Sequence, residues 1–492
     1  MKHFRLALIG YILFLQASQL FPQWMMQSVP LDSSVLLSID FKDSLVGCSG
    51  GYNFADGNVN GRAVYTTDGG NTWSLAQLPD STRSLFAMRF VDHQTVYAAA
   101  YRNPIHTKQD SEKILKLTQA KYFSHFDFLN SLSANFIASN RVMFMRSTDA
   151  GVSWSSYGTL PDSIVYLYGT SFVAPLIGYI IARADTVMQS QVLLLKTTNG
   201  GLSWAPLILP IPVDYLSNVL FTDSFKGYAV GSRRLEDTTG VPAGIVLQTT
   251  NAGLTWDYQQ FPDSTSLWKV FFTDNQTGYL VGTKGNNFEP VPIGSNTRGI
   301  VYKTTNAGNT WFLLPYSPDS TSFAGIQFKG NTGFVWGLKY FTSTIVNQEL
   351  FIARSTDAGI TWTRQVIPQV QSGWGYLFDG KMLSEMNVYV CGGDLVSPGL
   401  ILHTTNGGVT FVEEENNFTL PKEYLLEQNY PNPFNPSTKI IWQAPVGSWQ
   451  SIKVYDVLGN EVATIVNEEK SAGTYEIDFD ASRLSSGVYF YK

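Results

Sequence analysis

One eight-residue phrase occurs seven times along this chain and constrains its fold more than any other feature. The first copy is Thr66–Trp73 (TTDGGNTW), and each copy has Asp or Asn in third place, Gly in fifth place and an aromatic residue in eighth place. The third position is taken by Asp68, Asp149, Asn199, Asn251, Asn306, Asp357 and Asn406. The eighth is taken by Trp73, Trp154, Trp204, Trp256, Trp311, Trp362 and Phe411. From Asp149 onward the copies lie about fifty residues apart, and this period predicts an array of propeller blades.

A second phrase alternates with the first: an apolar strand ending in Phe, a polar turn, then Gly-aromatic-x-Val-Gly. Its clearest copies are residues 220–231 and 271–282. Together the two phrases predict a four-stranded antiparallel meander, for example 216–221, 227–231, 245–249 and 255–261. We therefore expect an all-β chain with a seven-bladed β-propeller over residues 24–421.

Trp24 stands just ahead of residues 29–32 (VPLD), as other Trp residues of the repeat stand ahead of a similar stretch. This spacing predicts that the N-terminus supplies an outer strand. Such a strand would close the ring with the last blade and leave no open edge.

The eight-residue phrase resembles the Asp-box, or BNR, repeat. The combined unit is similar to the seven-bladed propellers of photosystem II assembly factors and sortilin-type receptors. In such a turn the Asp or Asn side chain accepts hydrogen bonds from backbone N–H groups, Gly supplies positive φ, and Trp packs over the blade. We interpret the seven copies as structural turns, with a metal or ligand site as the alternative.

The interval before Asp149 is longer than the others because blade 2 carries an insertion at residues 102–141. A loop of this length is more often functional or disordered than incidental. Strand direction places it on the face opposite the repeats. We expect a protein or glycan ligand on that face, with the candidate binding residues His106, Lys108, Tyr122 and His125.

Residues 422–492 change character and predict a small Ig-like β-sandwich with an extended, proline-rich entry strand. The phrase Asn429, Tyr430, Pro431, Asn432, Pro433, Phe434, Asn435 and Pro436 closely resembles the start of the type IX secretion C-terminal sorting domain. The resemblance implies recognition by the secretion machinery at the outer membrane of a Gram-negative bacterium, and a secreted or surface location. An ordinary adhesion module is the alternative. The family runs on through a further strand, so the stop at Lys492 predicts a truncated domain or impaired sorting.

Residues 1–23 have the charged start and short apolar run of a secretory signal, which implies passage through the periplasm. The apolar run is shorter than the ~20 residues of a bilayer span, so we expect no transmembrane segment in the mature protein. The net charge of −6 and the lack of a basic run argue against a nucleic-acid partner.

The sequence supplies few candidates for chemistry. Five scattered histidines predict no metal site and no cofactor. Cys48 and Cys391 are expected to be small buried residues, with a disulfide as the alternative. Carboxylates suitable for hydrolysis fall in loops with nothing to pair them, namely Asp110, Asp185, Asp237 and Glu289.

Asp-box propellers also occur among sialidases and endoglucanases, so an extracellular glycoside hydrolase is the alternative function. A sialidase needs an arginine triad around its central pocket, whereas Arg62, Arg146 and Arg354 recur in third strands away from the axis. We propose no catalytic residue and expect a non-catalytic binding or scaffold protein.

Overall fold

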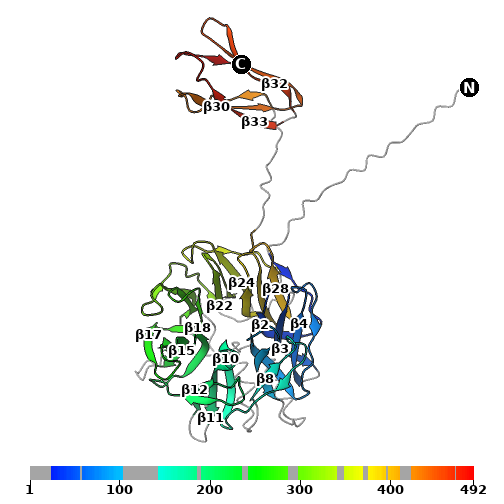
Figure 1. Cartoon of the computed structure of the whole chain (residues 1–492), viewed down its shortest axis with the longest axis vertical. Coiled ribbons are helices and arrows are strands. Elements are labelled where there is room, and N and C mark those ends of the chain that lie inside the picture. Colours follow the sequence, from blue (N-terminus) through cyan, green and yellow to red (C-terminus); the bar gives the residue numbers. More distant parts are fainter. Residues whose placement is uncertain are drawn as a thin grey trace, which may run out of the picture. The chain divides into compact units, whose positions relative to one another are not determined.

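The computed structural model describes residues 24–55, 58–102, 142–185, 190–234, 242–285, 297–340, 348–368, 375–394, 397–409, 423–470 and 473–492. The chain divides into two compact units, one formed by Pro22–Val409 and one that includes Thr410–Lys492. The described residues are all-β (Figure 1). Within these ranges no helix has the length and apolar character needed to cross a membrane.

The larger unit is a ring of seven antiparallel blades, as the repeat predicts (Figure 1). In blades 1 to 6 the strands follow one another along the chain from the inner strand to the outer strand. Blades 1 to 3 are β2 (Ser34–Phe41), β3 (Gly47–Ala55), β4 (Asn58–Thr66), β5 (Ser74–Leu75); β6 (Thr82–Phe90), β7 (Val96–Arg102), β8 (Val142–Ser147), β9 (Ser155–Ser156); and β10 (Ile164–Ala174), β11 (Ile177–Asp185), β12 (Ser190–Thr197), β13 (Ala205–Leu207). Blades 4 and 5 are β14 (Tyr215–Phe221), β15 (Gly227–Arg234), β16 (Pro242–Thr249), β17 (Asp257–Asp263); and β18 (Thr265–Phe272), β19 (Gly278–Lys284), β20 (Arg298–Thr304), β21 (Phe312–Leu313). Blades 6 and 7 are β22 (Thr321–Lys329), β23 (Thr332–Tyr340), β24 (Gln348–Ser355), β25 (Thr363–Arg364); and β26 (Tyr376–Met382), β27 (Val388–Gly393), β28 (Leu400–Thr404), β1 (Met25–Met26).

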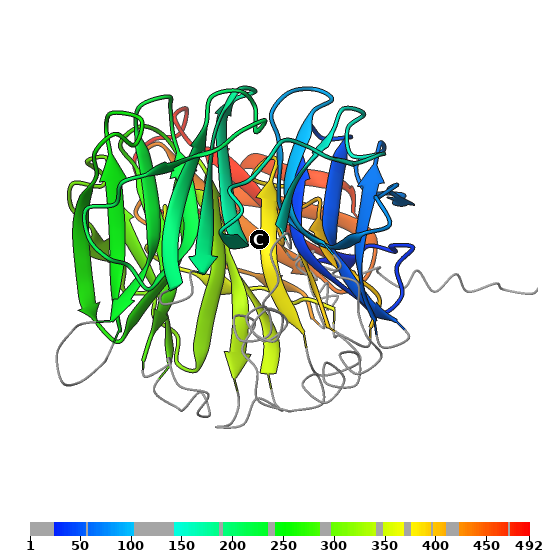
Figure 2. The same cartoon turned by 90° about the horizontal axis from the view of Figure 1, so that it is seen from below.

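Apolar side chains fill the spaces between blades, because each sheet must bury both faces against its neighbours. The second strands contribute most of the largest fully buried rings, including Tyr179, Tyr228, Tyr279 and Tyr389. In Figure 2 the strands run between the two faces of the ring. Alternate residues of an inner strand therefore point to opposite faces of its sheet, toward one or the other neighbouring blade.

Every inner strand carries a register shift against the second strand of its blade. The shift is a β-bulge, which adds a residue and bends the strand. It also explains the last Gly of the second phrase. A Cβ on Gly231 or Gly282 would overlap the carbonyl of Tyr215 or Ser266 in the neighbouring inner strand.

The N-terminal strand closes the ring, which confirms the prediction made from Trp24. In β1, Met25 pairs with His403 and Met26 with Leu402, both in β28. The N–H of Gln27 then donates to the carbonyl of Ile401 at 2.8 Å. The last blade thus obtains its outer strand from the start of the propeller.

The smaller unit contains two three-stranded sheets, which fit the predicted sandwich. One has the order β29 (Leu425–Leu426), β30 (Ser437–Ala444), β33 (Gly473–Asp480), and the other β32 (Glu461–Lys470), β31 (Ser448–Tyr455), β34 (Phe490–Tyr491). Trp442, Ile452 and Val466 form its core. The proline-rich phrase was expected to be an extended entry strand, and this is wrong: it forms bends after a two-residue strand. Prolines have no N–H to donate to a sheet.

Candidate functional site

The seven repeat turns join the third and outer strands and hold themselves together with side-chain hydrogen bonds. In the first turn the Thr66 hydroxyl accepts from the Gly70 N–H at 2.8 Å. The Asp68 carboxylate accepts from the Thr72 N–H at 2.9 Å and the Thr72 hydroxyl at 2.6 Å. These hydrogen bonds lower the pKa of Asp68. Its oxygens are therefore occupied by the turn itself.

The fourth residue of each repeat turn connects the turn to the rest of the ring. Its N–H donates to a carbonyl in the turn between the inner and second strands of the same blade, at 2.7 to 2.9 Å; the donors are Gly69, Ala150, Gly200, Ala252, Ala307, Ala358 and Gly407. In four blades its carbonyl also accepts a Tyr hydroxyl from the preceding blade, as when Tyr228 donates to Ala307 at 2.8 Å. The repeat turns and these inner turns therefore share one face.

Several residues predicted from the sequence lie outside the described residues. They are His106, Lys108, Tyr122 and His125 of the insertion, Phe411 of the last repeat, and the loop carboxylates Asp110, Asp237 and Glu289. Asp185 ends β11. The ligand-binding role of the insertion residues and the possible catalytic role of these carboxylates stay predictions. Cys48 and Cys391 are buried free thiols, as expected, and burial raises the pKa of each.

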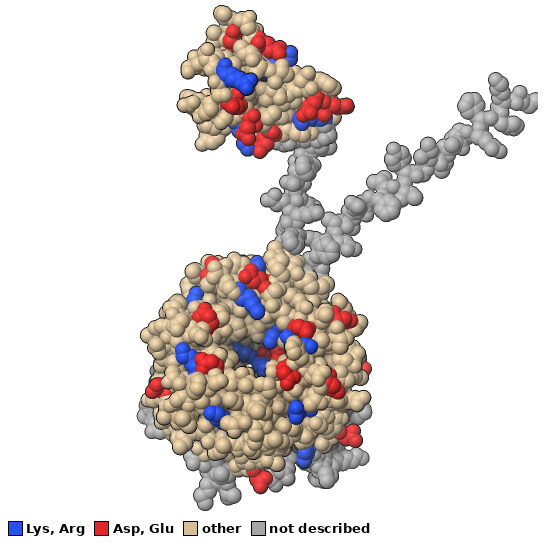
Figure 3. Space-filling model, in the orientation of Figure 1, with Lys and Arg blue, Asp and Glu red and all other residues tan. Residues whose placement is uncertain are grey.

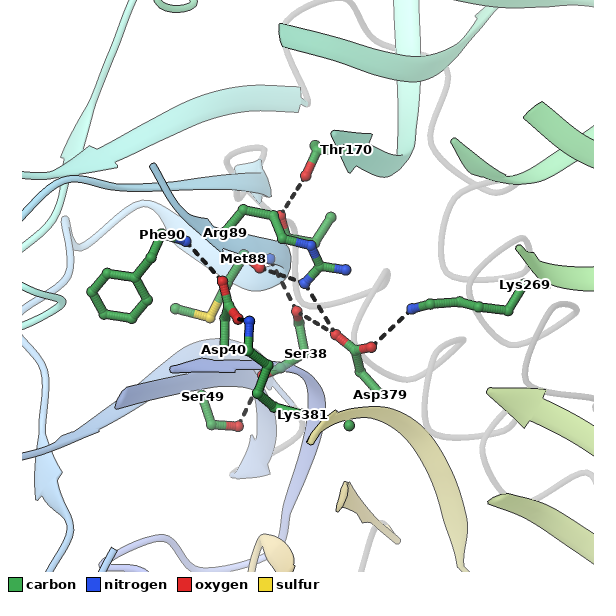
Figure 4. Close-up of polar contacts among 12 residues, drawn as sticks. Ser38, Asp40, Ser49, Met88, Arg89, Phe90, Thr170, Lys269, Asp379 and Lys381 are labelled. Atoms are coloured by element: carbon green, nitrogen blue, oxygen red, sulfur yellow. Dashed lines mark hydrogen bonds and ion pairs between the residues drawn. The ribbon is translucent and has the colours of Figure 1, made fainter. Parts of the chain in front are cut away.

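The structure brings together five charged side chains from four inner strands, which sequence reasoning did not single out. Figure 3 shows a hollow at the centre of the ring with acidic and basic atoms inside it. The hollow contains the group that we call the axial network: Asp40, Arg89, Lys269, Asp379 and Lys381 (Figure 4). Four of them lie in the half of their strand nearer the repeat-turn face, and Asp379 lies at the middle of β26.

Asp379 is the centre of the axial network. Lys269 Nζ lies 2.9 Å from its Oδ1, and Arg89 Nη1 lies 3.3 Å from its Oδ2. The Ser38 hydroxyl donates to the same Oδ2 at 3.1 Å. Burial alone would raise the pKa of Asp379, but the two cations outweigh it and hold the pKa well below its ordinary value. Asp379 is therefore a carboxylate and not a proton donor near neutral pH.

Asp40 is the second carboxylate and joins three blades. It lies 2.6 Å from Lys381 Nζ in blade 7. It accepts from the backbone N–H of Phe41 at 3.0 Å and of Phe90, in blade 2, at 2.8 Å. Inner strands have no further strand to pair with on their axial side, so side chains satisfy such N–H groups.

Uncharged side chains elsewhere in the ring make the same kind of hydrogen bond to a backbone N–H of the next blade. The Ser171 hydroxyl accepts from the N–H of Phe221, and Gln327 Oε1 accepts from the N–H of Met382, at 2.9 and 2.6 Å. Polar side chains on inner strands thus link neighbouring blades. The contacts of Asp40 with blades 2 and 7 are therefore also part of what holds neighbouring blades together.

The axial network does not provide the pair of carboxyl groups that glycoside hydrolysis requires. That reaction needs one carboxyl group that is protonated as an acid and a second that is a base or nucleophile. Both axial carboxylates are paired with cations, and the pKa of Asp379 is lowered, not raised. Three cations share two carboxylates, so the network carries one positive charge in excess. This composition is suited to binding an anion.

The residues of the axial network could have been found from the alignment of the repeats. Aligning the seven inner strands on their final Phe or Met places Asp40, Arg89 and Lys381 at one position, and Lys269 and Asp379 at another two residues earlier. A charged residue in an otherwise apolar inner strand must face the axis or pair within the protein.

Aromatic side chains gather toward the other end of the inner strands. Ring centroids are 6.5 Å apart for Tyr101 and Tyr166, 5.5 Å for Tyr168 and Tyr215, and 6.0 Å for Tyr215 and Trp268. Burial raises the pKa of Tyr101 and Tyr215. These residues lie toward the face on which the sequence predicts a ligand. The described residues contain no group of three metal-ligating side chains.

Comparisons with known proteins identify the smaller unit. Residues 428–492 match the family described as the secretion system C-terminal sorting domain. This unit is therefore a sorting domain of type IX secretion, and it marks the chain as secreted or displayed at the cell surface. The sequence-based resemblance to this family is confirmed.

The propeller is similar in sequence to a photosystem II assembly factor. The chain is 24% identical over 369 residues to photosystem II stability/assembly factor HCF136 of Arabidopsis thaliana, which covers 62% of this chain and 86% of the relative. The structure YCF48 bound to D1 peptide is 15% identical and covers 78% of this chain and 96% of that chain, with a TM-score of 0.49. A polysaccharide lyase described as an ulvan lyase is 8% identical and covers the same shares, with a TM-score of 0.42.

Proposed function

We propose that this chain is a non-catalytic binding protein that acts outside the cell and is exported by its C-terminal sorting domain. One observation supports the non-catalytic part above all. Asp40 and Asp379, the carboxylates of the axial network, are both paired with cations. The pKa of Asp379 is also lowered, whereas the acid of a two-carboxylate hydrolase must be kept protonated by its surroundings.

The relative HCF136 is named as a photosystem II stability and assembly factor. This supports a binding or scaffold role for the propeller. Fold alone does not carry function, so the chemistry of the ligand has to come from the residues of the axial network.

The export route is part of the proposal. Residues 1–23 would direct the chain to the periplasm as a signal peptide, and residues 422–492 would then be recognised by the secretion machinery at the outer membrane. Residues 24–421 would be the cargo. The repeat turns would be structural Asp-box (BNR-type) turns, because their polar groups are used within the ring.

Deleting Tyr424–Lys492 in a host that has this secretion system tests the proposal. We expect the full chain in the medium or on the cell surface, and the shortened chain in the periplasm, as measured by fractionation and immunoblotting. Secretion unchanged by the deletion would contradict the sorting role.

The secreted full chain should then be incubated with a panel of neutral and acidic polysaccharides. We expect no new reducing ends and no unsaturated products above the level of a buffer control. Turnover of any polysaccharide would refute the non-catalytic role and leave the export result intact.

A further inference from the structure

Within the described part of the chain, Arg89 uses one of its guanidinium nitrogens for hydrogen bonds, and the other two make none. Its Nη1 donates to the Met88 carbonyl at 2.6 Å and to Asp379 Oδ2 at 3.3 Å. In Figure 4 this nitrogen alone of the guanidinium carries dashed lines. Among the described residues, Nε and Nη2 have no hydrogen-bond partner, and neither belongs to the buried polar atoms that lack one. These N–H groups therefore face solvent in the hollow.

Nε and Nη2 form one edge of the planar guanidinium. Two parallel N–H groups at this spacing match the two oxygens of a carboxylate, which is the bidentate geometry that makes arginine selective for such groups. The edge is held in place because Nη1 is fixed at two points. A pre-positioned donor pair loses little conformational freedom when a ligand binds.

The charge around this edge also favours a single negative group. Lys269 and Lys381 each contact one carboxylate in the network and retain further N–H donors. The side chains of Arg89, Lys381 and Lys269 are 28%, 32% and 17% exposed, so all three are reachable from solvent. One monoanion would cancel the one excess positive charge of the axial network.

We propose that the axial network binds a carboxylate group of a ligand, with the Nε and Nη2 edge of Arg89 as the primary donor and Lys269 as the second cation. This inference rests on the proposed role as a binding protein and specifies the chemistry that the ligand must carry. The carboxylate can belong to a simple organic acid or to a sugar acid, and the test separates these two sources.

The full chain should be titrated with sodium acetate and sodium D-glucuronate at constant ionic strength, with binding followed by ligand-observed NMR. Acetamide and D-glucose are the neutral counterparts. We expect both acids to bind and both neutral compounds to bind at least ten-fold more weakly. Glucuronate tighter than acetate would indicate contacts to the sugar, and equal binding would assign the site to the carboxylate alone.

Arg89→Lys keeps the positive charge beside Asp379 but removes the planar donor edge, and it should weaken acid binding at least five-fold. Arg364→Lys is the matched control. Arg364 lies on the outer strand β25 and pairs with Glu349 on β24, so its replacement should leave acid binding unchanged. If the melting curve shows that Arg89→Lys does not fold, Lys269→Met, which removes the excess charge, replaces it with the same expectation.

Three results would overturn the proposal: equal binding of acids and their neutral counterparts, tighter binding of sulfate than of acetate, or acid binding unchanged in a folded Arg89 or Lys269 variant. None of them would bear on polysaccharide turnover, so the failure of this inference is distinct from failure of the proposed function.

Discussion

His403 shows how a single residue can hold the ring closed. Its ring stacks on Tyr389 with centroids 3.9 Å apart. Its Nδ1 lies 3.2 Å from Nε2 of Gln27, just after the closing strand, and its Nε2 lies 2.9 Å from Oδ1 of Asn387. Burial disfavours the charged imidazolium and lowers the pKa of His403 to about 4.

This shifted pKa predicts a pH dependence of stability. Between pH 6.5 and about 4 the unfolded chain binds a proton at His403 and the folded chain does not. Stability is therefore expected to fall as the pH is lowered through this window, by roughly 3 kcal/mol in total, and the contribution of His403 levels off below it. Urea denaturation at a series of pH values measures the effect.

His403→Gln should lose most of this slope between pH 6.5 and 4, because the variant has no titrating group at that position. His93 is exposed, so His93→Gln is the matched control and should retain the slope. A slope that is unchanged in His403→Gln would contradict the assignment.

At the scale of the element, the repeat turn tolerates two chemistries in its third position. In Asp turns the carboxylate accepts from the Ser or Thr hydroxyl, as Asp149 does from Ser153 at 2.5 Å. In the turns of Asn199, Asn251 and Asn306 the side-chain amide donates to that hydroxyl instead, at 2.8 Å. A hydroxyl can donate or accept, so both versions close the turn.

Asp149→Asn is therefore expected to change the free energy of unfolding by less than about 0.5 kcal/mol near neutral pH, whereas Asp149→Ala should cost about 1 kcal/mol through lost hydrogen bonds. Burial alone would raise the pKa of Asp149, but the hydrogen bonds from Ser153 and Ser147 outweigh burial and lower it. Its contribution is thus lost only in acid, below about pH 4. Chemical denaturation of the three proteins tests this order, and equal loss in both variants would contradict it.

The elements could be predicted from sequence because the signals for them are local. The phrase Thr66–Trp73 contains the hydroxyl, the carboxylate and the positive-φ glycines that its own turn requires. The axial network could not be predicted in the same way. Arg89 and Asp379 lie 290 residues apart, and Lys269 and Asp379 lie 110 residues apart. The period of a strand indicates which side chains share a face of its sheet, but not which carboxylate each one reaches.

At the scale of the whole molecule, the seventh blade is built from both ends of the propeller sequence. In the other blades a Trp of the repeat immediately precedes the outer strand. In blade 7 that place is taken by Trp24, ahead of β1, and its indole lies against Gly408 as that of Trp256 lies against Gly253. Trp24 is fully buried and packs edge-on against Phe334 at 5.7 Å.

Trp24→Ala should destabilise the propeller by about 3–5 kcal/mol, because it leaves a cavity where the ring is closed. Trp449 in the smaller unit is 67% exposed, so Trp449→Ala is the control and should lower stability by less than about 1 kcal/mol. Thermal unfolding followed by near-UV circular dichroism compares the two. A loss no greater for Trp24→Ala than for Trp449→Ala would show that the closing strand contributes little.

The pairing of β1 with β28 also determines when the propeller can finish folding. Met25 leaves the ribosome early, but its partner His403 follows 378 residues later. Until β28 is made, β1 has no partner strand and blade 7 is incomplete. The other blades are therefore not yet held in a closed ring. Contacts of such sequence separation form slowly. Closure of the ring therefore cannot precede synthesis of β28, so the propeller stays open while most of its chain is being made.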